Sequence, residues 1–213
     1  MEDIGTIVLA TGALGTAAFG IVEALKWTWL GYAGFGVIKR LLGPILNTYD
    51  IAYGPDWERL LRAQYRGDRA ELTRVLRQGA RIGLTEKNAP ALAQFLGTVS
   101  GMELTRAVKE AHALAQAAND EELDVNSRHA LGRFELAVDA RIDAACALAQ
   151  QRYADTARVA ALVIALGIAI AVGIIIDRLF HAVLVGIAAV PLAPVAKDLV
   201  TALQSASVAL RGK

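Results

Sequence analysis

Arginine is the residue type whose number and spacing in this chain could do chemistry most directly. Between Trp57 and Arg81, arginines recur at helical spacing, and apolar side chains occupy the opposite face of the expected helix. These arginines are Arg59, Arg62, Arg66, Arg69, Arg74, Arg77 and Arg81. A guanidinium group carries five N–H donors in one plane and binds phosphate or carboxylate oxygens in pairs. The cluster therefore predicts a surface for anionic groups.

Three interpretations of this arginine face stay open. It binds anionic lipid headgroups beneath a membrane, where each basic residue contributes roughly 1 kcal/mol. It meets the acidic Asp120–Asp124 turn of its own chain or of another subunit. Or it is a solvated helix face, the commonest role of charges at this spacing. Nucleic acid is not expected as a partner, because the segment from Asp50 to Arg158 balances 15 basic residues with 16 acidic ones.

The other reactive residue types form no catalytic or cofactor motif. His112 and His129 fall on different expected helices and His181 lies in an apolar segment, so no pair has metal-ligand spacing. The single cysteine, Cys146, lies between two alanines and is expected to be a packed side chain. The sequence contains no P-loop, GxSxG, CxxC, HExxH or dinucleotide-binding glycine pattern. We therefore expect no enzyme activity, no cofactor and no metal.

Three long segments of the chain contain no charged residue. They are Ile4–Val22, Val159–Ile176 and Leu179–Ala196, with 19, 18 and 18 residues. As helices they are about 27 Å long, close to the hydrocarbon thickness of a membrane. Glu2 and Asp3 precede the first segment where a secretory signal carries basic residues, which favours a permanent anchor. The sequence predicts three transmembrane helices.

The basic residues predict the orientation of these helices. They follow the first and third segments and precede the second, at Lys26, Lys39, Arg40, Arg152, Arg158, Lys197, Arg211 and Lys213. By the positive-inside rule, the middle of the chain and the C-terminus are cytoplasmic and the N-terminus is outside. We expect a multi-pass protein of the cell (inner) membrane, with membrane lipids as partners.

The expected fold class is all-α, an integral membrane protein with a cytoplasmic helical bundle. Residues 1–48 form the first transmembrane helix plus an interfacial or re-entrant segment, Trp27–Leu46, that its glycines and Pro44 interrupt. Residues 49–157 form the cytoplasmic domain, and residues 158–213 a transmembrane hairpin with an amphipathic tail.

Ser100 and Glu103 have capping-box spacing, which predicts the start of a helix. No strong helix breaker occurs from Ser127 to Ile176, which predicts one long helix that couples the domain rigidly to the second span.

Small residues recur every four positions in two of the apolar segments. The first segment has Gly12, Thr16 and Gly20, and the second has Ala161, Ala165, Ala169 and Gly173. Such stripes let helix backbones approach closely in a membrane, where packing replaces the hydrophobic drive. They predict helix contacts, either within one chain or between subunits.

Pro191 and Pro194 lie near the end of the third segment. Each removes a backbone donor, so the helix should kink or end there. One interpretation is a pore or gate element, because free carbonyl groups at that depth are tolerated only inside protein or beside water. The other is a hairpin whose last helix ends at the interface.

The stretch Ala193-Pro194-Val195-Ala196-Lys197-Asp198-Leu199 is similar to the ending of a group of uncharacterised bacterial inner-membrane proteins. In those proteins an N-terminal anchor, a cytoplasmic helical insert and a C-terminal membrane hairpin finish in an Ala-Pro…Asp-Leu segment. Val195 and Ala196 stand where aromatic residues are usual. The resemblance implies a bacterial membrane location and carries no activity.

The functional expectation follows from these patterns together. We expect a non-enzymatic membrane scaffold or anchor that assembles through its helices with itself or with a larger membrane complex. The alternative is an oligomeric ion channel or pore in which the proline-broken third segment lines the pathway.

Overall fold

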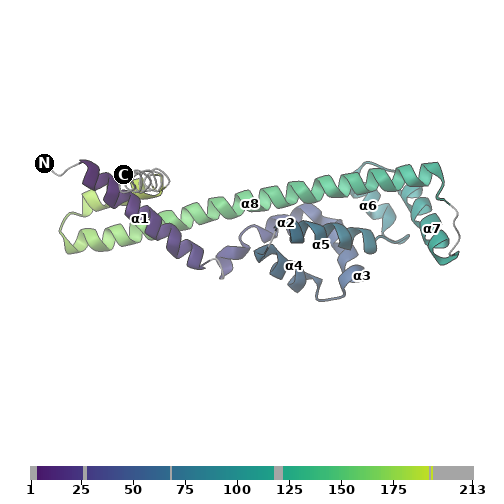
Figure 1. Ribbon diagram of the computed structural model, residues 1–213, viewed down its shortest axis with the longest axis horizontal. Coiled ribbons are helices and arrows are strands. Elements are labelled where there is room, and N and C mark those ends of the chain that lie inside the picture. Colours follow the sequence, from purple (N-terminus) through teal and green to yellow (C-terminus); the bar gives the residue numbers. More distant parts are fainter. Residues whose placement is uncertain (1–3, 26–27, 68, 118–121, 192, 194–213) are drawn as a thin grey trace, which may run out of the picture. The chain divides into compact units, whose positions relative to one another are not determined.

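The computed structural model describes residues 4–25, 28–67, 69–117, 122–191 and 193. Every regular element in these residues is a helix, so the all-α class is confirmed. The chain divides into two compact units, which we call the terminal unit (Met1–Gly31 with Tyr153–Lys213) and the central unit (Tyr32–Arg152). Helix α8, Val125–Ile175, contributes residues to both units (Figure 1).

The central unit packs short helices around the N-terminal half of α8. They are α2 (Phe35–Leu42), the 3₁₀ helix η3 (Gly43–Thr48), α3 (Tyr49–Tyr53), α4 (Trp57–Arg66), α5 (Arg69–Ile82), α6 (Ala89–Leu96) and α7 (Gly101–Ala117). Their apolar faces form one core with α8, in which Tyr49, Leu76, Phe134 and Ile142 are almost fully buried. Burial of such large side chains is the main stabilising term for a unit of this size.

The segment expected to lie at the membrane interface, Trp27–Leu46, belongs in large part to this core. Ile38 is 1% exposed, and Leu42 and Ile45 are 0% exposed. These side chains recur at intervals of three and four residues, so they share one helical face, while Lys39 and Arg40 are exposed. The boundary between the two units falls after Gly31, so most of this segment belongs to the central unit.

The arginine-rich stretch forms two helices where its pattern suggested a continuous one. Helix α4 ends at Arg66, and Gly67 follows with φ −86° and ψ −133°, a non-helical conformation that interrupts the helix. Helix α5 begins at Arg69. The seven arginines therefore do not share one helical face, because the chain changes direction between them.

Side-chain hydrogen bonds stabilise the first turns of α7 and α8. At α7, Ser100 Oγ accepts from the Glu103 N–H and Glu103 Oε2 accepts from the Ser100 N–H, both at 3.2 Å, which is a complete capping box. At α8, Glu110 of α7 accepts hydrogen bonds from the Asp124 N–H at 2.7 Å and from the Ser127 hydroxyl. A side chain from the preceding helix thus binds a donor that the first turn of α8 would otherwise leave to water.

The terminal unit contains α1 (Ile4–Ala24), η2 (Trp29–Tyr32, which crosses the unit boundary), the C-terminal part of α8 and a helix at Leu179–Pro191. Its small core includes Ala18, Val22, Leu30, Ala161, Ala165 and Ala189. Within the described residues, α8 is the one helix long and apolar enough to cross a membrane, and Ala10–Ala24 and Leu179–Pro191 are shorter apolar helices. The architecture with three spans stays a prediction.

Candidate membrane-facing and interaction surfaces

Large apolar side chains cover the outside of the terminal unit. On α8, Val163 is 63% exposed, Ile174 67% and Ile175 81%; on the next helix, Phe180 is 72% exposed. Only 22% of the most apolar 18-residue window of α8 is buried. A core helix of a water-soluble protein buries such residues, and an exposed apolar surface of this extent marks contact with a partner or a membrane.

The inside of the terminal unit is built from small side chains. Ala161 and Ala165 are 0% exposed, Ala169 is 5% exposed, and Gly173 is buried as well. The small-residue stripe of the second apolar segment therefore faces the interior of its own unit. With small residues inside and large apolar residues outside, the unit has the arrangement typical of helices that associate in lipid.

The buried stripe of α1 differs in register from the one that the sequence suggested. Gly12 is buried, but Thr16 and Gly20 are exposed, and no atom lies within 4 Å of where a Cβ at Gly20 would be. The Thr16 hydroxyl donates to the Gly12 carbonyl oxygen at 2.9 Å, within its own helix. The buried positions recur instead at Thr11, Gly15, Ala18 and Val22.

Three glycines make the closest helix approaches in the terminal unit. A Cβ at Gly15 would overlap the carbonyl oxygen of Ala189, and one at Gly186 would lie 2.9 Å from Ala169 Cβ. A Cβ at Gly173 would lie 3.2 Å from Leu179 Cα. Of these, only Gly173 belongs to a small-residue stripe predicted from the sequence. Because α1 is apolar on all sides, its sequence does not distinguish the register of Thr11, Gly15, Ala18 and Val22 from that of Gly12, Thr16 and Gly20.

A tight turn separates α8 from the following helix. Asp177 has φ +54°, in the left-handed region that aspartate tolerates better than most residues. The Arg178 N–H donates to the Gly173 carbonyl oxygen at 3.0 Å, five residues back, and the Ala182 N–H donates to the Arg178 oxygen at 3.1 Å. Pro191 is exposed at the end of the Leu179–Pro191 helix. Pro194 lies outside the described residues.

The arginines of α4 contact carboxylates and aromatic rings of the central unit. Arg62 lies 2.7 Å from Glu58 and over the Phe35 ring, and Arg66 lies 3.9 Å from the centre of the Tyr32 ring. Arg59 lies 3.9 Å from Asp56, with both side chains more than four-fifths exposed. Glu58 also accepts a hydrogen bond from Lys39. Lys39 and Arg62 together lower the pKa of the Glu58 carboxyl group. Exposed pairs of this kind contribute about 0.2–1 kcal/mol each.

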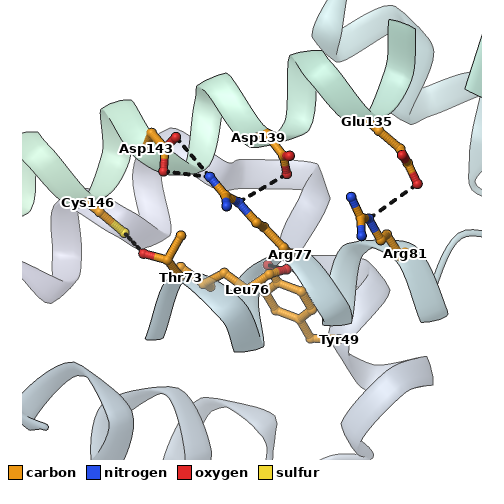
Figure 2. A network of polar contacts seen from close by, with 9 residues as sticks. All are labelled: Tyr49, Thr73, Leu76, Arg77, Arg81, Glu135, Asp139, Asp143 and Cys146. Atoms are coloured by element: carbon orange, nitrogen blue, oxygen red, sulfur yellow. Dashed lines mark hydrogen bonds and ion pairs between the residues drawn. The ribbon is translucent and has the colours of Figure 1, made fainter. Parts of the chain in front are cut away.

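The arginines of α5 bind mostly to α8, as Figure 2 shows. Arg77 donates to both carboxylate oxygens of Asp143, at 3.1 and 2.9 Å, and its Nε lies 3.2 Å from Asp139, outside hydrogen-bond geometry. Arg81 Nε lies 3.3 Å from Glu135. Arg74 binds Glu71 one turn back at 2.6 Å. Of Arg69, the structure describes the backbone only.

The acidic partners of α5 were not recognised in the sequence. Glu135, Asp139 and Asp143 are spaced by four residues, as are Arg77 and Arg81, so each set lies on one helical face. Matching these two repeats would have identified the pairing. Within the described part of the acidic turn, Asp124 lies 4.0 Å from Arg106 and Glu122 lies 3.0 Å from Arg128. Neither of these arginines belongs to the arginine cluster.

Beneath these ion pairs lie polar groups of the core. The Tyr49 hydroxyl donates to the Leu76 carbonyl oxygen at 2.8 Å, and burial raises the pKa of this phenol far above its usual value (Figure 2). Cys146 is 3% exposed, and the Thr73 hydroxyl lies 4.0 Å from its sulfur. Among the described residues, no group of three or more histidine, cysteine, aspartate or glutamate side chains is arranged to hold a metal ion.

Comparison with known proteins adds no assignment. No model of a known protein family matches the chain. No match is found among curated proteins, and none among solved structures.

Proposed function

We propose that this chain is a non-enzymatic membrane scaffold, whose terminal unit is its anchor and whose central unit assembles with a second copy or with a larger membrane complex. The observation that carries the proposal is the arrangement of the terminal unit, with alanine and glycine inside and valine, isoleucine, leucine and phenylalanine outside. In water this surface would cost about 25 cal/mol for each Å² of exposed apolar area. In hydrocarbon that cost disappears.

The proposed location is the cell (inner) membrane of a bacterium, with the N-terminus outside and the central unit and C-terminus in the cytoplasm. The distribution of basic residues supports this orientation. Between Arg158 and Lys197, the only charged residues are Asp177 and Arg178, which form the turn after α8. A charged turn between two apolar helices suits the opposite membrane surface.

The assembly surface that we propose lies on the central-unit part of α8. Leu136 is 72% exposed and Leu148 is 48% exposed. Between them Ala140, Ala144 and Ala147 are exposed at spacings that keep them on the same helical face. An apolar stripe with small residues at its centre lets a second helix approach closely.

Native mass spectrometry of the full chain in lipid nanodiscs tests this proposal. We expect particles larger than one chain, and we expect Ala144→Glu to reduce them to monomers because it places a charge in the stripe. Ala113→Glu is the matched control, since Ala113 is also exposed on a helix, α7, and the same substitution there should leave the assembly unchanged. Strictly monomeric wild-type particles without a partner would contradict the scaffold.

The pore alternative predicts a different measurement. If the end of the third segment lines a pathway, Pro191→Ala should change ion flux into liposomes that contain the protein. The scaffold predicts no flux above that of empty liposomes for either the wild type or the variant.

A further inference from the structure

We infer that the terminal unit holds part of one acyl chain of an anionic phospholipid in a groove beside the turn after α8. The inference rests on the membrane location proposed above. It goes further by naming a binding site, its ligand and the residue that recognises the headgroup.

The groove has apolar walls from three separate segments of the terminal unit. Ile168 and Val172 of α8 and Ile176, the residue that follows its last turn, are spaced by four residues and form one wall. Ala182 and Val185 of the Leu179–Pro191 helix contribute to the second wall, and Leu14 of α1 to the third. A continuous apolar row along a helix suits an extended hydrocarbon chain, because every methylene group then meets a side chain.

Two basic side chains are among the residues that line the groove. Arg178 belongs to the turn after α8, and His181 lies in the first turn of the following helix. The hydrogen bond from the Arg178 N–H to the Gly173 oxygen fixes the backbone of this turn against α8. Since Asp177 and Arg178 are the only charged residues between Arg158 and Lys197, the turn marks the level of the headgroups. The apolar walls therefore lie at the depth of the acyl chains.

The volume and the charge identify the ligand. The cavity volume is about 260 Å³, somewhat below the roughly 300–1,000 Å³ of sites that enclose a whole small molecule. It therefore suits part of one acyl chain of a lipid whose remainder stays in the bilayer. A guanidinium group binds phosphate oxygens in pairs, and basic pockets between membrane helices recognise anionic headgroups in this way.

Because Asp177 lies next to Arg178, selectivity for an anionic headgroup requires direct contact with the Arg178 side chain. Asp177 and Arg178 carry opposite charges, so a general positive field does not explain selectivity. The recognition that we infer is contact between the Arg178 guanidinium and the lipid phosphate. A zwitterionic choline headgroup brings its own ammonium group near the same guanidinium, which disfavours it relative to glycerol.

Lipid retention by the full chain tests the inference. The protein is reconstituted in nanodiscs with equal amounts of phosphatidylglycerol and phosphatidylcholine, and the lipids that remain bound after release are counted by native mass spectrometry. We expect the wild type to retain phosphatidylglycerol preferentially. Arg178→Gln should lower the ratio of retained phosphatidylglycerol to phosphatidylcholine about fivefold, the effect of one basic contact at a membrane surface.

Two further variants separate the groove from general effects. Arg158→Gln removes an arginine at the other end of the apolar part of α8, outside the groove, and should leave the ratio unchanged. Val172→Trp fills the groove, so it should reduce retention of both lipids. An absent preference in the wild type, or equal ratios in Arg178→Gln and Arg158→Gln, would overturn the inference. Protein that does not enter membranes at all would instead overturn the proposed function.

Discussion

At the contact between α3 and α5, the side chains of the central core leave no room for an additional atom. A Cβ at Gly79 would overlap the ring of Tyr49, whose hydroxyl is bound to Leu76 on the same helix as Gly79. We expect Gly79→Ala to lower the free energy of unfolding by about 1–3 kcal/mol, because the ring must move and strain its hydrogen bond. Chemical unfolding of the full chain in detergent, followed by near-ultraviolet circular dichroism, measures this.

The matched control for that substitution is on α8. No atom lies within 4 Å of where a Cβ at Gly132 would be, and its backbone is helical. Gly132→Ala should therefore stabilise the protein by about 0.5–1 kcal/mol, through the lower backbone entropy of alanine in the unfolded chain. Equal effects of the two substitutions would mean that the Gly79 contact is not tight.

At the scale of elements, the connection between α7 and α8 should depend on pH. Hydrogen bonds from the Ser127 hydroxyl and from the Asp124 backbone lower the pKa of Glu110 below its usual value of 4.5. A lowered pKa in the folded state contributes stability that is present above the unfolded pKa and is lost as the pH falls through the folded one. We expect the wild type to exceed Glu110→Gln in stability at neutral pH, with the difference shrinking below pH 4.5. Unfolding curves at several pH values test this, and parallel curves would exclude the role of Glu110.

The packing of α1 offers a second test at this scale. Gly15 approaches the backbone of Ala189 so closely that no side chain fits, whereas Gly20, five residues later, has open space around it. We expect Gly15→Leu to lower the stability of the terminal unit by about 1–3 kcal/mol and Gly20→Leu to change it little. Thermal unfolding in detergent compares the two. A larger effect at Gly20 would support the Gly12, Thr16 and Gly20 stripe that the sequence suggested.

At the scale of the whole molecule, the proposed orientation can be tested with single cysteines in a Cys146→Ala background. The positive-inside rule places the turn after α8 outside and the loop between α5 and α6 inside. An impermeant maleimide should therefore label Arg178→Cys in intact bacterial cells. It should label Lys87→Cys, which is exposed in that loop, only after permeabilisation. The opposite pattern would reverse the orientation, and labelling of both in intact cells would contradict the proposed spans.

The features of this protein that can be predicted from its sequence are mostly local. The helical class, the capping box at Ser100 and the long helix through residues 125–175 follow from residues that are neighbours in the chain. The candidate membrane helix follows from an uninterrupted run of apolar residues in α8. Interactions within one or two helical turns are enough to specify each of these features.

Which helix faces are buried and which charged residues form pairs depends on the packing of segments that are distant in the chain. Helix α1 is apolar on every side, so no polar face indicates that Gly15 and Ala18 point inward while Gly20 does not. Likewise, Arg77 of α5 pairs with Asp139 and Asp143, about 60 residues away in the chain. The segment near Ile38 has a helical apolar face that either a membrane surface or a protein core could bury. In each case the partner is distant in the chain, and the spacing within one segment does not say which other segment it contacts.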